Sequence, residues 1–99
     1  MPQLRILFPP PGWFLADSRM EVHLDGTAVY DGSFKSGMDV TRDVTPGEHR
    51  IQAFIHVGPI ARVRQYAVHI PDRTSMELKL AYSRIWGNFK SEPTIHRTE

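Results

Sequence analysis

The 99-residue chain contains no cysteine, which excludes disulfide bonds and thiolate metal sites. Apolar runs long enough to cross a membrane are also absent. The segment Met1–Gly12 lacks the charged start and apolar middle of a signal peptide. These absences favour a cytoplasmic protein, or a module of a larger protein, without membrane insertion.

An excess of one charge sign is also lacking, because 12 Lys and Arg face 11 Asp and Glu. The two signs are interspersed, so no basic surface for nucleic acid is expected. Helix-forming runs are scarce, whereas short apolar alternations separated by Gly, Pro and Asp recur. The sequence therefore predicts an all-β fold, a two-sheet antiparallel β-sandwich of immunoglobulin-like type with about seven strands. Residues 1–89 form this domain and residues 90–99 a polar, flexible tail.

The clearest strand signal runs over Val44–Val57. Apolar and polar residues alternate there with period 2, as in a half-buried strand. The residues expected to face inward are Ile51, Ala53, Ile55 and Val57. Pro46 and Gly47 suit a type II turn, because proline presets φ and glycine accepts a positive φ. Such a turn splays hairpin strands, so we expect an arch that carries the chain from one sheet to the other.

A hairpin is expected around Asp25–Gly26, the strongest short-range hairpin signal of the chain. Its strands would be Arg19–Leu24 and Thr27–Tyr30. A two-residue loop would place Val22 opposite Val29, with both side chains on one face.

Two other connections lack a regular pattern. Residues 31–37 carry two turn signals with only Phe34 between them to bury, which predicts an irregular loop. Pro9–Pro11 end a first short strand, because proline donates no backbone hydrogen bond. This triplet is either a stiff crossover anchored by Trp13 and Phe14 or a ligand for a proline-recognising domain.

A change of phase divides the strand expected at Ile60–Ile70. Ala61 and Val63 occupy odd positions, whereas the later apolar residues occupy even ones. A single bulge near residues 64–65 would keep both sets inward and turn Arg62 and Arg64 outward, where they protect a sheet edge. The alternative is that the two arginines lie on an edge strand where facing matters less.

The alternation in Met76–Tyr82 is the cleanest of the chain, and it fails immediately afterwards. Trp86 and Phe89 lie beyond this last regular strand. They either close the open end of the sandwich or form an exposed apolar patch that docks on another chain.

A leading strand, a proline break, a strand that ends in Asp-Gly and a strand entered through Pro-Gly follow one another in this chain. The matching residues are E-V-H-L-D-G (Glu21–Gly26), T-P-G-E-H-R-I-Q-A (Thr45–Ala53) and the closing strand pair Tyr66–Ile70 and Met76–Tyr82. This order resembles PEGA-type domains. Two motifs depart from that pattern: G-S-F-K-S-G-M-D replaces Gly-x-Thr-Pro, and V-G-P-I-A-R replaces Gly-Tyr. The resemblance implies an immunoglobulin- or transthyretin-like accessory module of bacterial multidomain proteins, without catalysis.

His49 follows the expected arch and has the phase of Ile51, so its side chain should point inward. Sandwich folds often place a tyrosine at such a corner to bond the backbone. We therefore expect a buried, structural imidazole bonded to a main-chain carbonyl or amide. The expected structural set is Asp25, Gly26, Pro46, Gly47 and His49. His23 and His56 are expected on outward faces, and no metal-binding spacing is present.

Catalytic arrangements are not indicated by the sequence. Asp39 and Asp43 share a strand face but would lie about 13 Å apart, beyond the spacing of glycosidase carboxylates. No serine has a G-x-S-x-G context. Arg50, Arg62 and Arg64 either gather on neighbouring strands to bind an anionic partner or form a solvated face.

These features together predict a non-catalytic interaction or scaffolding module that contacts a protein partner or another copy of itself, with no cofactor and no metal. The expected partner-binding residues are Arg62, Arg64, Trp86 and Phe89. One alternative is a carbohydrate-binding module in which Trp13, Tyr82 and Trp86 form a stacking platform. A transthyretin-like hydrolase is the remaining alternative, although no clustered His/Arg set supports it.

Overall fold

The structure, a computed structural model, describes residues 2–10, 18–57, 59–83, 88–89 and 94–98. The described residues form strands and no helix. Among them there is therefore no helix that is long and apolar enough to cross a membrane. The strands are β1 (Gln3–Phe8), β2 (Arg19–Leu24), β3 (Thr27–Ser33), β4 (Met38–Asp43), β5 (Gly47–Val57), β6 (Ile60–Ile70), β7 (Ser75–Lys79), β8 (Tyr82–Ser83), β9 (Asn88–Phe89) and β10 (Thr94–Thr98).

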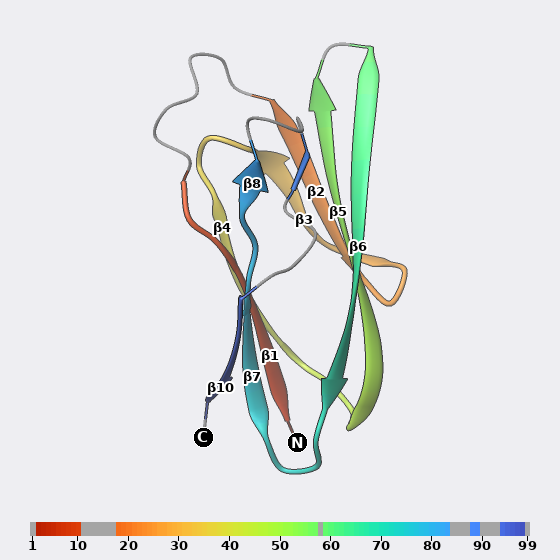
Figure 1. Cartoon of the computed structure of the whole chain (residues 1–99), viewed down its shortest axis with the longest axis vertical. Coiled ribbons are helices and arrows are strands. Elements are labelled where there is room, and N and C mark those ends of the chain that lie inside the picture. The colour runs from red at the N-terminus through yellow and green to blue at the C-terminus, as the bar shows by residue number, and fades with distance from the viewer. Residues whose placement is uncertain (1, 11–17, 58, 84–87, 90–93, 99) are drawn as a thin grey trace.

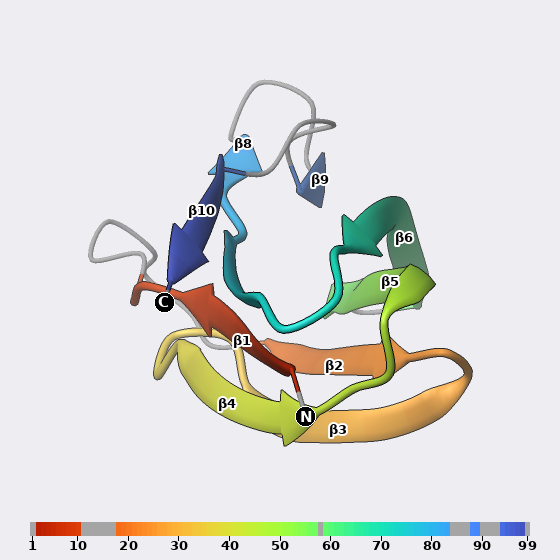
Figure 2. The same cartoon turned by 90° about the horizontal axis from the view of Figure 1, so that it is seen from below.

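Two four-stranded sheets face each other (Figures 1 and 2). Sheet A has the order β10-β7-β1-β4, and sheet B has the order β3-β2-β5-β6. The short β8–β9 ladder lies at the gap between β6 and sheet A (Figure 2). The predicted all-β, two-sheet sandwich is confirmed, and β1 to β7 provide its seven principal strands. One ladder departs from the antiparallel expectation, because β1 pairs with β7 in parallel.

The core lies between the sheets and follows the period-2 pattern of the sequence. In β1, β2 and β5 the inward residues are buried while their neighbours are exposed or half-buried. The largest fully buried side chains are Phe34, Phe89, Leu4, Ile6, Met20, Ile51, Ile55, Ile70, Leu78, Leu80 and Val22. Each of these large apolar groups contributes about 1.5–3 kcal/mol when it is fully buried.

The β2–β3 hairpin turns at Asp25 and Gly26, as predicted. Their φ angles of 51° and 85° match a type I′ turn, whose twist suits the flanking strands. The predicted pairing of Val22 with Val29 is wrong, because the register shifts at Val22 and places it opposite Tyr30. A bulge adds one residue to β3, which the loop length alone does not reveal.

The connection from β3 to β4 is shorter than predicted, because Asp31–Ser33 continue β3 instead of turning. Phe34 is fully buried, as expected. Gly37 has a φ of 69°, and a Cβ there would lie 2.4 Å from the Phe8 carbonyl oxygen. Only glycine fits this close approach to the end of β1.

The predicted arch is confirmed, because β4 belongs to sheet A and β5 belongs to sheet B. Gly47 opens β5 with a φ of 119°, in the region that favours glycine. Beyond the arch, Ile51, Ala53 and Ile55 are buried as predicted. The side chain of Val57 lies outside those that the structure describes.

Gly47→Val is expected to lower the free energy of unfolding by about 1–3 kcal/mol through backbone strain alone. A Cβ at this position would meet no atom within 4 Å, so no steric clash contributes. Urea unfolding measures the effect. Glu48→Val is the control, since it places valine at an exposed strand position and should change stability by less than about 0.5 kcal/mol. Equal stability of the two variants would contradict the strained arch.

The bulge predicted in β6 is absent, because β5 and β6 pair without a register shift from Gly47↔Ile70 to Val57↔Ile60. Tyr66, Val68 and Ile70 are buried. Ala61 and Val63 therefore fall on the outer face of sheet B, and both are exposed. The alternative prediction is confirmed: Arg62 and Arg64 lie on an edge strand, because β6 is the last strand of sheet B.

Two expectations for the C-terminal part need correction. The prediction of a flexible tail over residues 90–99 is wrong for Thr94–Thr98, which forms β10 and pairs with β7. The segments Tyr66–Ile70 and Met76–Tyr82 do not form a closing strand pair, because β6 and β7 belong to different sheets.

Candidate functional site

The imidazole of His49 lies at the junction of the arch and the β2–β3 hairpin. The residue is 9% exposed. Its Nδ1 lies 2.5 Å from Asp25 Oδ2, and its Nε2 lies 2.6 Å from the Thr45 carbonyl oxygen. The prediction of a buried imidazole bonded to the main chain is confirmed. Asp25 as its second partner was missed, because that contact depends on β2 lying beside β5.

Asp25 is itself held in place by the backbone of β5. Its Oδ1 accepts a hydrogen bond from the Arg50 amide, and its own amide donates to the Arg50 carbonyl, both at 2.8 Å. Burial alone would raise the pKa of Asp25, but the bonds from the Arg50 amide and the His49 ring outweigh it and lower the pKa. The Asp25 hydrogen bond, followed by the Thr45 carbonyl, raises the pKa of His49.

A hollow of about 530 Å³ opens beside this pair. Its lining includes Asp25, His49, Arg50, Tyr66 and Ala67. Burial raises the pKa of Tyr66 to about 12, so its hydroxyl stays neutral at ordinary pH. The hollow and the exposed side chain of Asp25 therefore give solvent access to the pair, although His49 itself is buried.

The predicted partner-binding residues do not form one exposed surface. Arg62 and Arg64 have the inward phase of β6, and Arg64 Nε donates to the Phe89 carbonyl at 3.1 Å. Phe89 is fully buried, with its ring 5.6 Å from Phe8 and 6.2 Å from Phe34. Its assignment to a docking patch is therefore wrong, and its alternative role in closing the core is confirmed. Trp86 lies outside the described residues.

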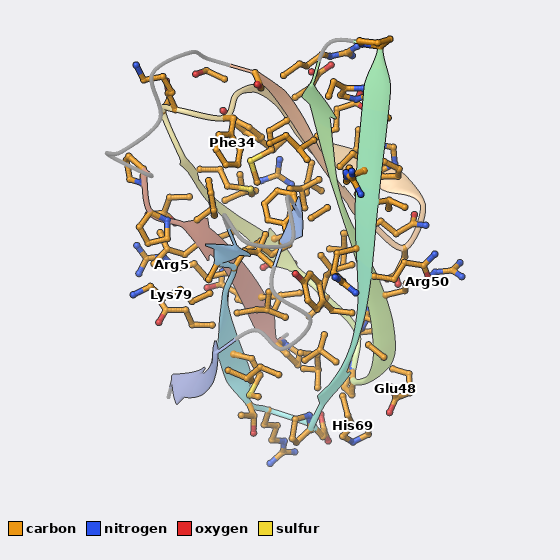
Figure 3. All side chains as sticks on the ribbon, turned by 45° about the horizontal axis from the view of Figure 1, so that its top comes forward. Arg5, Phe34, Glu48, Arg50, His69 and Lys79 are labelled. Carbon is orange, nitrogen blue, oxygen red and sulfur yellow. The ribbon has the colours of Figure 1, made fainter. Side chains whose placement is uncertain are left out.

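Arg50 does not join Arg62 and Arg64 in a basic cluster. It lies on the outer face of sheet B opposite Ala67, whereas the other two arginines have the inward phase. Figure 3 shows Arg50 and Glu48 directed away from the interior that contains Phe34. The expected anion-binding group is therefore divided between two faces.

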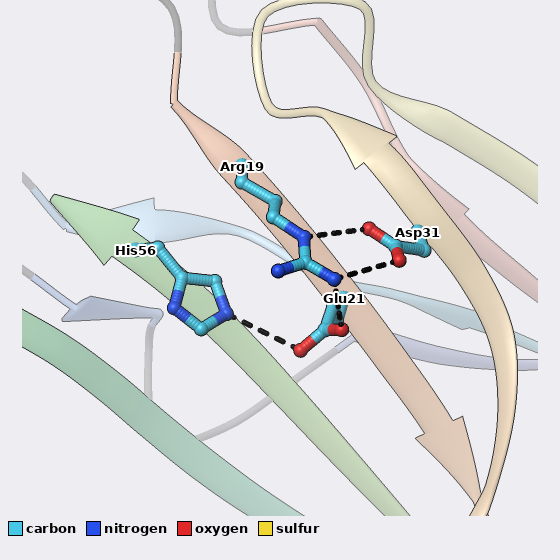
Figure 4. A network of polar contacts seen from close by, with 4 residues as sticks. All are labelled: Arg19, Glu21, Asp31 and His56. Carbon is cyan, nitrogen blue, oxygen red and sulfur yellow. Dashed lines mark hydrogen bonds and ion pairs between the residues drawn. The ribbon is translucent and has the colours of Figure 1, made fainter.

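A network of charged side chains covers the β2–β3 half of the outer face of sheet B (Figure 4). Arg19 donates from Nε and Nη2 to both carboxylate oxygens of Asp31 at 2.9 Å, and from Nη2 to Glu21 at 2.8 Å. His56 Nε2 lies 3.2 Å from the other oxygen of Glu21. Because the Arg19 side chain is 57% exposed, these pairs orient the side chains more than they stabilise the fold.

The β5–β6 half of the same face carries no Asp, Glu, Lys or Arg at five adjacent outward positions. We call these positions the β5–β6 patch; they are Gln52, Phe54, Ala61, Val63 and Gln65. Phe54 lies directly opposite Val63, which is 45% exposed. His23 packs its ring 4.9 Å from that of Phe54 and has a buried Nε2 without a hydrogen-bond partner.

The outer face of sheet A carries ion pairs that link three of its strands. Arg5 binds Asp39 through Nε at 2.8 Å and Glu77 through Nη1 at 3.1 Å, which joins β4, β1 and β7. Asp39 is thus engaged in an ion pair and not in a carboxylate pair with Asp43.

The β5–β6 patch on sheet B was not predicted from the sequence. Its one sequence signal is the phase change at Ala61 and Val63, and a bulge explains that signal equally well.

The described residues carry few groups suited to chemistry. Within these ranges, no three His, Asp or Glu side chains gather as a metal site would require. The proposed sugar platform cannot be placed, because Trp13, Trp86 and the side chain of Tyr82 lie outside the described part, as does the Pro-rich segment beyond Pro10. Comparison with protein-family models, curated proteins and solved structures finds no match to this chain.

Proposed function

We propose that this domain is a non-catalytic interaction module that associates with a second copy of itself through the β5–β6 patch. The observation that carries the proposal is the inverted polarity of the first half of β6. Val63 is 45% exposed on the outer face, while Arg62 and Arg64 have the phase of the core. A strand with one solvated face normally has its apolar side chains on the core face and its polar side chains outside.

The charge of the patch favours a second copy as the occupant. Interface centres are depleted of charged residues and enriched in aromatic ones, and the patch contains Phe54 and no charged side chain. A charged partner surface would lose solvation there without gaining an ion pair. An identical uncharged patch has no such cost. The neighbouring Arg19 is paired within its own chain, so it needs no partner charge.

The size of the patch indicates a weak dimer. Three rows of outward residues across the two strands cover on the order of 200 Å², about a quarter of a standard interface side. We therefore expect association at micromolar to millimolar concentration. The resemblance to PEGA-type domains, which are accessory modules, supports a contact role of this kind.

Sedimentation equilibrium of the full chain from about 10 µM to about 1 mM tests the proposal. The wild type should shift from monomer towards dimer. Val63→Glu should weaken association at least tenfold, because a carboxylate would be buried without a partner. Thr41→Glu, at an exposed position of the edge strand β4, is the matched control and should behave as the wild type.

A wild type that stays monomeric at the highest concentration would exclude self-association. A dimer that is weakened by Thr41→Glu and not by Val63→Glu would place the contact on sheet A. A sugar that alters tryptophan fluorescence of a monomeric chain would favour the carbohydrate-binding alternative.

A further inference from the structure

The ring of His49 lies between two groups that can only accept hydrogen bonds. The Thr45 carbonyl oxygen lies 2.6 Å from Nε2 and has no hydrogen to donate. Asp25 Oδ2 lies 2.5 Å from Nδ1. The pKa of Asp25 is lowered, so this carboxyl is ionised at neutral pH and also acts only as an acceptor. Both ring nitrogens must therefore carry a hydrogen, and only the imidazolium form does so.

We infer that His49 is doubly protonated in the folded protein and acts as a proton-dependent latch between the β4–β5 arch and the β2–β3 hairpin. Loss of either hydrogen leaves a nitrogen lone pair facing an oxygen lone pair, so one of the two contacts must open. The backbone bonds between Asp25 and Arg50 hold the carboxylate in place, so the change falls on the imidazole and the arch.

The charged groups that act on this latch lie on β5 and at the β2–β3 turn, and the β6 residues that face the ring carry no charge. Within β5, Glu48 also raises the pKa of His49, and Arg50 stabilises the ionised Asp25. Val68 of β6 lies opposite His49 and is apolar, and Tyr66 is neutral. His69 of β6 faces outward, with Nδ1 3.2 Å from Glu48 Oε1. The hollow beside the pair gives water access to it.

The sign of the pH dependence follows from the two shifts. Because folding raises the pKa of His49, its contribution to stability is complete below the unfolded value of about 6.5 and is lost as pH rises through the folded pKa. Because folding lowers the pKa of Asp25, its contribution is present above about 3.9 and is lost as pH falls through the folded pKa. The latch is therefore strongest between these limits and opens towards alkaline pH.

Nuclear magnetic resonance of the full chain with ¹⁵N-labelled histidine tests the latch directly. At pH 6, both ring nitrogens of His49 should have the shifts of protonated nitrogen. Its titration midpoint should lie above the value of about 6.5 for an unstructured histidine. The backbone amide shifts of Asp25 and Arg50 should follow the same titration.

Asp25→Asn separates the charge from the fold, because Asn-Gly is as favourable as Asp-Gly in a type I′ turn. The asparagine amide can donate to a neutral Nδ1, so the His49 midpoint should fall. The stability difference from the wild type should be largest between pH 4 and about 6.5 and shrink at higher pH. Glu48→Gln removes a nearby charge without removing a hydrogen bond to the ring and should shift the midpoint less.

If either ring nitrogen of His49 were unprotonated at pH 6 in the wild type, that result alone would overturn the inference. Equal shifts of the midpoint in Asp25→Asn and Glu48→Gln would also overturn it, since the specific pair would then be unnecessary. The latch does not depend on self-association, and a monomeric chain would give the same titration.

Discussion

Val22→Asp is expected to lower the free energy of unfolding by about 4 kcal/mol, because it buries a carboxylate without a partner. Val22 is fully buried on the central strand β2, between Ala53 of β5 and Tyr30 of β3. A domain of this size has a total stability of about 5–15 kcal/mol. The variant should therefore be largely unfolded or should melt far below the wild type, as measured by circular dichroism.

His23→Asp is the matched control one residue along the same strand. His23 points to the outer face of sheet B and contacts the ring of Phe54. Its replacement should cost no more than about 1 kcal/mol, because His23 is only half-buried and its position lies outside the core. A shift of register by one residue would exchange the two results, so a harmless Val22→Asp with an unfolded His23→Asp would contradict the fold of sheet B.

Phe89→Ala should lower the free energy of unfolding by about 3–5 kcal/mol, the usual cost of emptying a buried aromatic site. The ring of Phe89 is fully buried beside Phe8 and Phe34, in the gap between β6 and sheet A. Chemical denaturation of the full chain measures this cost. Its cause would be the cavity left between the two sheets.

Ile95→Ala provides the control for Phe89→Ala. Ile95 also lies late in the chain but is 43% exposed, so its replacement should cost less than about 1 kcal/mol. If Phe89→Ala were equally mild and instead altered the oligomeric state, the residue would be a docking group and not part of the core.

Much of the fold could be predicted because turn chemistry and alternation act locally. Asp25–Gly26 specifies a type I′ hairpin through the two positive φ angles that it accepts, and Pro46–Gly47 specifies the arch. The prediction of a bulge in β6 is wrong, because a bulge and an outward-facing apolar pair produce the same sequence pattern. Thr94–Thr98 was missed because β10 is short and carries one apolar residue, so its strand pattern is too weak to detect.

The candidate sites were predictable only where a single element determines them. The inward phase of His49 followed from its own strand, but its contact with Asp25 required the order of β2 and β5 in sheet B. The β5–β6 patch likewise depends on the register that places Phe54 opposite Val63. Strand order and register are set by contacts between distant segments, which alternation along one segment does not encode.

The proposed self-association and the His49 latch involve different parts of β5. The patch includes Phe54 on the outer face near the β5–β6 turn, whereas His49 lies at the opposite end of the strand. A change at one site should therefore leave the other unaffected, and the two proposals can be tested separately.

Intermolecular paramagnetic relaxation enhancement is the most direct test of association through the β5–β6 patch. The cysteine-free chain allows a single spin label at Ala67→Cys, an exposed position on β6 just outside the patch. When this protein is mixed with ¹⁵N-labelled wild type, it should broaden the amide signals of β5 and β6 in the ¹⁵N-labelled copy, which carries no spin label. A label at Thr41→Cys on β4 should not. Broadening confined to sheet A, or none from either label at about 1 mM, would contradict the proposed function.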